Sequence, residues 1–163
     1  MQTKIDPSTL SWRVINDGVM GGLSRSRFEC ERGELRFSGN LSLENNGGFA
    51  SILARLETPI QGFAALRMTV SGDGRQYQAR LREHPDSRGY AWRALFQANR
   101  RESDVVLGAG DFAPVLRGTP VPGANPLRET PIEYLGFMLS QSEPGPFTLV
   151  VHEIELEAGR REA

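Results

Sequence analysis

Few side chains in this chain of 163 residues are suited to catalysis. It has two histidines, His84 and His152, and one cysteine, Cys30. No G-x-S-x-G segment is present, and Cys30 lies in a predicted strand, which favours an inert thiol. Only His84 or His152 could supply the base of a Ser-His-Asp triad, and we interpret both as structural or solvent-facing. We therefore predict that the protein is not an enzyme and has no catalytic residues.

Cofactor and metal motifs are equally weak. The glycine-rich segments at 17–22 (DGVMGG) and 108–110 (GAG) lack the Lys-Ser/Thr of a P-loop and the G-x-G-x-x-G spacing, and no helical pattern follows either. Two histidines and one cysteine cannot build a structural zinc site. Asp17 and Asn16 could contribute oxygen ligands to calcium, but no D-x-D-x-D-G loop is present. The sequence predicts no cofactor and no metal.

Aromatic and arginine side chains form the more suggestive pattern. Tyr90 and Trp92 share one side of a predicted strand, and Tyr77, Arg80 and Arg82 lie on a strand that could neighbour it. Aromatic rings flanked by arginines can bind a sugar or a peptide. These five residues are our candidate ligand face. The alternative interpretation is that the rings pack in the core and the arginines are ordinary surface residues.

Composition narrows the possible partners. Nineteen basic and twenty acidic residues give a formal net charge of −1, so no global electrostatic attraction to nucleic acid exists. No apolar run of 18 residues and no signal-peptide pattern occur in the sequence, so we expect no membrane insertion and a cytoplasmic protein. A single cysteine excludes an internal disulfide framework.

Short strands separated by turns dominate the hydropathy pattern, and no window of 11 residues keeps a helical period. The segments 63–70 and 75–82 flank SGDG and predict a β-hairpin. Residues 132–139 are apolar on both parities after Glu133, which predicts a central strand. The pattern predicts an all-β protein, built as an antiparallel sandwich or barrel.

We expect one domain over residues 1–163, ending in a short polar tail at 157–163. The stretch 108–131 carries five prolines and predicts a structured connection across one end of the sandwich. Phe112, Val115 and Leu116 are its expected anchors.

Several longer segments are far more specific than these motifs. They are WRVINDGVMGGLSRS at 12–26, FSGNLSLENNGGFAS at 37–51, GDGR-x-Y at 72–77, F-x-P-x-x-RG at 112–118 and LGFMLS at 135–140. Their order resembles the complex I intermediate-associated protein 30 family over about residues 12–156. One departure is that such members carry Gly-x-Trp where this chain has ESDVV at 102–106.

The resemblance implies a galactose-binding-domain-like β-sandwich of jelly-roll type. It also implies a non-enzymatic binding module, since the mitochondrial relatives are assembly chaperones for respiratory complex I (NADH:ubiquinone oxidoreductase). The partner would then be a protein, such as a complex I subunit or assembly factor. The motif residues that could contact it are Asn16, Asp17, Gly18, Val19, Met20, Gly21, Gly22 and Arg117. The alternative is that this glycine-rich loop only closes the sandwich and that Arg117 pairs with a carboxylate.

A second hypothesis is carbohydrate binding, because related jelly-roll sandwiches hold glycans on a concave sheet face. That face would use Tyr77, Arg80, Arg82, Tyr90 and Trp92.

Overall fold

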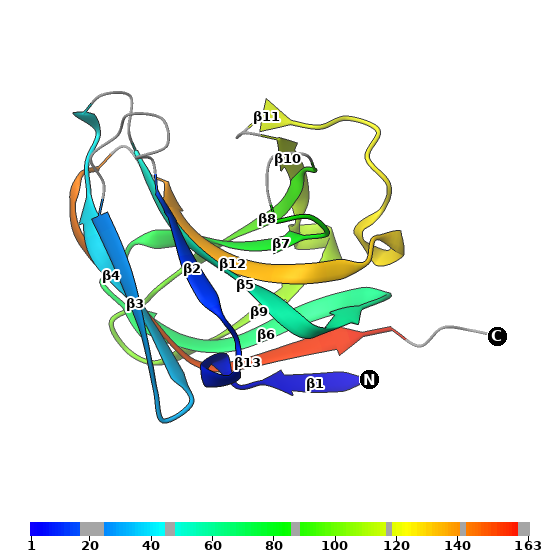
Figure 1. Cartoon of the computed structure of the whole chain (residues 1–163), viewed down its shortest axis with the longest axis horizontal. Coiled ribbons are helices and arrows are strands. Elements are labelled where there is room, and N and C mark those ends of the chain that lie inside the picture. Colours follow the sequence, from blue (N-terminus) through cyan, green and yellow to red (C-terminus); the bar gives the residue numbers. More distant parts are fainter. Residues whose placement is uncertain (17–24, 45–47, 86–88, 117–118, 141–142, 160–163) are drawn as a thin grey trace.

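The computed structural model describes residues 1–16, 25–44, 48–85, 89–116, 119–140 and 143–159 as two antiparallel sheets packed face to face in a jelly-roll sandwich (Figure 1). In spatial order, the six-stranded sheet contains β3 (Arg25–Glu31), β4 (Glu34–Leu41), β13 (Gly145–Ala158), β6 (Phe63–Gly72) and β9 (Ser103–Gly108), with β1 (Gln2–Ile5) beside β13. The seven-stranded sheet contains β11 (Thr119–Pro120), β10 (Ala113–Leu116), β8 (Ala91–Gln97), β7 (Gln76–Arg82), β12 (Ile132–Ser140), β5 (Phe49–Ile60) and β2 (Trp12–Asn16). Short 3-10 turns are η1 (Pro7–Thr9), η4 (Ala109–Asp111) and η5 (Leu127–Glu129). The predicted all-β jelly-roll class is confirmed.

The position of β12 follows from its composition. It pairs with β7 on one side and β5 on the other, which confirms the predicted central strand. Leu135, Phe137 and Leu139 face the interior and are fully buried. Gly136 and Met138 alternate with them and face outward, because successive side chains of a strand point to opposite faces.

The predicted hairpin of 63–70 with 75–82 is wrong. β6 pairs with β13 and β9, whereas β7 pairs with β8 and β12 in the other sheet. The connecting turn passes from one sheet to the other and is held by Ala98, which accepts from the Gly74 amide at 2.7 Å and donates to the Arg75 carbonyl at 3.0 Å. Both strands have one apolar face, and each buries it on the shared interior of the sandwich. Turn chemistry alone does not distinguish this arch from a hairpin.

A turn at residues 31–34 joins β3 and β4, and its Arg32 and Gly33 both have positive φ, at 53° and 78°. Such a turn matches the right-handed twist of the paired strands.

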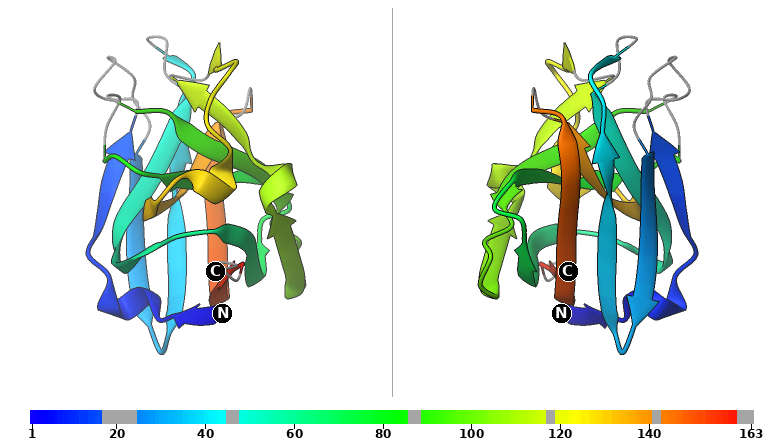
Figure 2. Two further views of the ribbon diagram at one scale, coloured as in Figure 1. Left: turned by 90° about the vertical axis from the view of Figure 1, so that its right-hand side faces the viewer. Right: turned by 90° about the vertical axis from the view of Figure 1, so that its left-hand side faces the viewer.

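The chain ends were less well predicted. β1 and β2 had not been recognised as strands, and β1 lies beside the last part of β13 (Figure 2). Backbone hydrogen bonds connect Met1 and Ala158 in both directions. Residues 157 and 158, at the start of the predicted tail, belong to β13.

The proline-rich connection is anchored mainly by Phe112 and Val115. The Phe112 ring packs edge to face on Phe63 with centroids 5.4 Å apart, and Val115 is buried on β10. Leu116, the third expected anchor, is 40% exposed. The segment therefore contributes β10 and β11 to the seven-stranded sheet rather than only spanning its end.

Prediction for the central strand: replacing Gly136 by alanine should destabilise the fold. A Cβ at this position would lie 2.7 Å from the Ile52 carbonyl oxygen and 3.0 Å from Leu53 Cδ1, so backbone would have to move. We expect the free energy of unfolding to fall by about 1–3 kcal/mol in urea titrations. Gly110→Ala is the control, because nothing lies within 4 Å of its Cβ. Equal losses in both variants would contradict the packing argument.

Candidate functional site

A groove of about 470 Å³ lies on the outward face of the seven-stranded sheet, on the side away from the core. We call it the sheet groove. It is lined by side chains from β2, β5, β7, β8, β10 and β12 and from the segment after β7: Arg13, Val14, Ile15, Phe49, Ser51, Ile52, Leu53, Arg80, Arg82, Pro85, Gly89, Ala91, Val115, Leu116, Gly136 and Met138. The lining is mostly apolar and carries three arginines. Among the described residues, no carboxylate lines it.

Strand alternation places the arginines there. On β7, Tyr77, Ala79 and Leu81 are fully buried in the core, so Arg80 and Arg82 point to the opposite face. On β8 the residue opposite Arg80 in the register is Arg93, which also points outward because Trp92 and Ala94 are buried. Two guanidinium groups therefore start from directly paired positions.

Arg80 is held within this face by neutral groups. Its Nη1 donates to Gln78 Oε1 at 2.7 Å and contacts Met138 Sδ at 3.6 Å. Burial, with smaller effects of Arg82 and Arg93, lowers the pKa of Arg80 to about 10. Arg80 is therefore still a cation at neutral pH.

Arg82 and Arg13 donate hydrogen bonds to backbone carbonyls of the segment after β7. Arg82 donates from Nε to the His84 carbonyl at 2.9 Å and from Nη2 to the Gly89 carbonyl at 3.1 Å. Arg13, on the edge strand β2, donates from Nη2 to the Pro85 carbonyl at 3.1 Å. These bonds hold the segment after β7 against the groove.

Tyr90 and Trp92 belong to a second, smaller pocket of about 290 Å³. Their rings meet edge to face with centroids 6.0 Å apart. The Trp92 indole is 6% exposed, and its Nε1 has no hydrogen-bond partner among the described residues. A buried donor without a partner is unfavourable, so this indole lowers the stability that its burial otherwise contributes.

The five residues of the predicted ligand face do not form one surface. The prediction that Tyr77 belongs to a ligand face is wrong, because its side chain is fully buried. Its ring stacks on Phe96 with centroids 6.2 Å apart, and its hydroxyl donates to Asp73 Oδ2 at 2.8 Å. Arg80 and Arg82 lie on the sheet groove, while Tyr90 and Trp92 line the smaller pocket. Arg80 and Arg82 point to the face of β7 opposite Tyr77, a separation that the alternation of side chains along β7 already predicts.

The predicted motif loop is only partly visible. Asp17, Gly18, Val19, Met20, Gly21, Gly22 and Arg117 lie outside the described residues. The Asn16 backbone ends β2 and pairs with Ala50 of β5. Whether these residues contact a partner stays a prediction.

The search for functional residues by sequence missed Arg13, Arg93, Leu53 and Met138. Arg93 follows Trp92 directly, so its outward direction could have been read from alternation once Trp92 was placed inside. The proximity of Arg13, Leu53 and Met138 could not, because it depends on the order β7-β12-β5-β2.

The histidines lie apart from each other. His152 Nδ1 is hydrogen bonded to Glu34 Oε2 and lies 3.3 Å from Glu102 Oε1, and its Nε2 is 2.8 Å from Ser71 Oγ. This set joins the neighbouring strands β4, β13 and β6, and neither the sheet groove nor the smaller pocket includes Ser71 or His152. His84 sits 3.7 Å from Glu83 at the smaller pocket. A serine–histidine–carboxylate contact therefore exists, but as a link between strands on the outward face of the six-stranded sheet.

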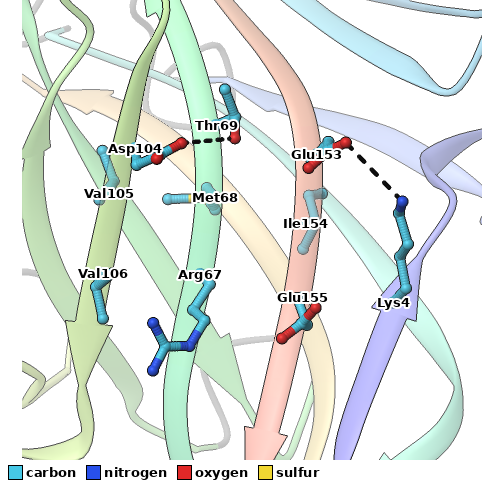
Figure 3. Close-up of a pocket in the computed structure, with 10 residues that line it drawn as sticks. All are labelled: Lys4, Arg67, Met68, Thr69, Asp104, Val105, Val106, Glu153, Ile154 and Glu155. Atoms are coloured by element: carbon cyan, nitrogen blue, oxygen red, sulfur yellow. Dashed lines mark hydrogen bonds and ion pairs between the residues drawn. The ribbon is translucent and has the colours of Figure 1, made fainter.

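A third hollow, of about 270 Å³, lies over β9, β6, β13 and β1 on the six-stranded sheet (Figure 3). Within it, Lys4 pairs with Glu153 at 3.9 Å, and Thr69 donates to Asp104 at 3.0 Å. Arg67, also in this hollow, pairs with Glu157 at 3.3 Å. Within the described part of the chain, no three His, Cys, Asp or Glu side chains are arranged to hold a metal ion.

No helix in the described part of the chain is long and apolar enough to cross a lipid bilayer.

The two packed antiparallel sheets define a jelly-roll β-sandwich domain. The family model of complex I intermediate-associated protein 30 matches residues 2–151, and the chain belongs to this family. No curated protein matches the sequence.

Several solved structures share the fold. A family 11 carbohydrate-binding module of the cellulosomal cellulase Lic26A-Cel5E of Clostridium thermocellum has a TM-score of 0.71 and 14% identity, with 99% of this chain and 97% of that chain covered. A family 29 carbohydrate-binding module has a TM-score of 0.62 and 8% identity, covering 98% and 93%. The low-affinity xylan-binding module CBM86 of Roseburia intestinalis has a TM-score of 0.57 and 10% identity, covering 96% and 95%. At these identities the likeness establishes the fold alone.

Prediction for the buried tyrosine: Tyr77→Phe should lower stability at neutral pH and reduce its loss in alkali. Burial and the bond to Asp73 raise the pKa of Tyr77 well above its usual range. A raised folded-state pKa contributes stability below the unfolded value of about 10, and that contribution is lost as pH rises above it. We expect a loss of about 1–3 kcal/mol at pH 7, measured by urea unfolding.

Repeating the urea titration at pH values up to about 11 tests whether the stability contributed by Tyr77 is lost in alkali. The wild-type protein should lose stability steeply there, and Tyr77→Phe should lose less. Parallel slopes for wild type and Tyr77→Phe would contradict the assignment.

Proposed function

We propose that this protein is a non-enzymatic binding module that recognises a protein partner during assembly of respiratory complex I. The observation that carries the proposal is the sheet groove: an apolar channel with arginines on a domain whose family is associated with complex I intermediates. The partner would be a subunit or an assembly factor. We further propose that the chain acts as a single cytoplasmic domain without a cofactor.

The lining of the groove supports a protein ligand rather than a stacked sugar. Sugar-binding sites commonly present aromatic rings, but Tyr77 and Trp92 are buried here and Tyr134 lies beneath the Arg55 guanidinium, 6.0 Å from its centroid. Phe49 is the aromatic side chain among the groove residues. Leu53 and Met138 instead provide aliphatic and thioether surface, which suits varied peptide side chains.

Prediction for the partner: the tagged protein, purified from its own host, should recover complex I subunits or assembly factors, and deletion of its gene should reduce assembled NADH dehydrogenase. Met138→Glu should remove the interaction, because it introduces a charge into the apolar part of the groove. Val106→Glu is the matched control, since Val106 is 53% exposed on β9 in the other sheet.

Mass spectrometry identifies the recovered proteins, and native gels measure the amount of assembled NADH dehydrogenase. Normal assembly in the deletion strain together with no recovered complex I component would contradict the proposed partner. Equal losses from Met138→Glu and Val106→Glu would contradict the groove as the contact surface.

Carbohydrate binding is the second candidate, and the pocket of Tyr90 and Trp92 favours it. The half-buried Tyr90 ring, which lines this pocket, could stack on a sugar. The shared fold with carbohydrate-binding modules agrees with this candidate.

Prediction for the second candidate: if a glycan binds, Tyr90→Ala should weaken its affinity about tenfold on a glycan array followed by calorimetry. Leu95→Ala, an exposed residue on the other face of β8, should leave the affinity unchanged. Absence of any bound glycan at high protein concentration would contradict this candidate.

A further inference from the structure

Two arginines of the sheet groove, Arg80 and Arg82, form an unusual arrangement of like charges with Arg93, which is paired with Arg80 on the neighbouring strand β8. Arg80 and Arg93 are direct cross-strand partners on β7 and β8, and Arg82 lies two residues along β7. Like charges placed directly opposite in a sheet destabilise it. Burial increases the effect, because solvent screens a partly buried pair less than an exposed one.

Several other arginines on or beside strands in the described chain lie next to an acid. Arg67 pairs with Glu157 at 3.3 Å, Arg55 with Glu133 at 3.4 Å, and Arg75 with Asp73 at 3.9 Å. Arg80 and Arg93 have no carboxylate partner among the described residues. The directly opposed pair of Arg80 and Arg93 therefore keeps its like charges without a described carboxylate to offset them.

Arg80 also keeps unused hydrogen-bonding capacity. Both of its contacts involve Nη1, so Nε and Nη2 have no hydrogen-bond partner within the described residues. A guanidinium group offers five N–H donors in a planar fork that matches a carboxylate. Arg82 and Arg13, by contrast, direct donors at backbone carbonyls and act as positioning residues for the segment after β7.

The surface next to these cations is apolar. Gly136 separates β7 from Leu53 of β5, and the Met138 sulfur contacts Arg80. In an extended peptide, side chains alternate between two faces with a repeat of about 6.6 Å, whereas neighbouring strands lie about 4.8 Å apart. A carboxylate over β7 and β8 and an apolar side chain over β12 and β5 can therefore come from one short segment.

We propose that Arg80 and Arg93 bind a carboxylate of an extended acidic segment of the protein partner, whose apolar side chains lie on Leu53 and Met138. This inference rests on the proposed function, since it names the chemistry of the segment that the sheet groove takes. The anion removes the repulsion between the paired guanidinium groups and uses the open donors of Arg80.

The test uses the full chain and a fluorescein-labelled peptide of about eight residues, alternating Glu and Leu, with a matched peptide that carries Gln in place of Glu. Fluorescence anisotropy should show binding of the Glu peptide and much weaker binding of the Gln peptide. Arg80→Gln and, separately, Arg93→Gln should each weaken Glu-peptide binding about tenfold or more, and Arg80→Lys less than Arg80→Gln. Raising the salt concentration should weaken binding further.

Arg36→Gln is the matched control, because Arg36 is an exposed arginine on β4 in the other sheet. It should bind the Glu peptide like the wild type. Thermal unfolding checks each variant, and the Arg93 variant keeps the test informative if Arg80→Gln does not fold. Equal binding of both peptides, or an affinity unchanged in Arg80→Gln and Arg93→Gln, would overturn the proposal.

Polygalacturonate is the second probe, since it carries carboxylates on a sugar chain. Binding of polygalacturonate without binding of the Glu peptide would overturn the peptide assignment. The peptide measurement needs no complex I component, so its failure is distinguishable from failure of the proposed function: recovery of complex I proteins with no acidic-peptide binding would refute only the ligand chemistry.

Discussion

The sandwich depends on a continuous series of aromatic contacts through its interior. Trp12 stacks on Phe137, Phe137 meets Phe96, Phe96 stacks on Tyr77, and Tyr77 meets Phe37, which packs on Phe147, with centroids between 5.0 and 6.5 Å apart. The first four rings come from the seven-stranded sheet and the last two from the six-stranded sheet. Burial of these rings drives the two sheets together, because the free energy gained scales with the apolar area removed from water.

This interior also determines the outer surface. Since side chains alternate along a strand, burying Tyr77 requires that Arg80 and Arg82 face outward, and burying Trp92 does the same for Arg93. A shift of one residue in register would bring these cations into the core at a prohibitive desolvation cost. The arginine face is therefore tied to the packing of the rings.

The outward faces of the two sheets differ in whether their cationic side chains lie beside carboxylates. On the outward face of the six-stranded sheet, Lys4 lies beside Glu153 (Figure 3). Arg67 and His152 also lie beside carboxylates, and such contacts mainly connect neighbouring strands. In the sheet groove, Arg80 is bonded to a glutamine and a methionine. Side chains that already pair with an opposite charge offer a partner protein little electrostatic attraction. Cations without an acidic neighbour can still attract acidic groups of a partner.

The sequence by itself determined the all-β class, the central position of β12 and the family, because hydropathy alternation and motif order are local properties. It also indicates that Tyr77 and Arg80 point to opposite faces of their strand, because side chains alternate along a strand. Only the tertiary structure decided that β6 and β7 belong to different sheets, that Arg93 lies opposite Arg80, and that Arg13 reaches Pro85. Those facts depend on which strands become neighbours. Strand order is set by burying all apolar faces in one interior, which no local segment specifies.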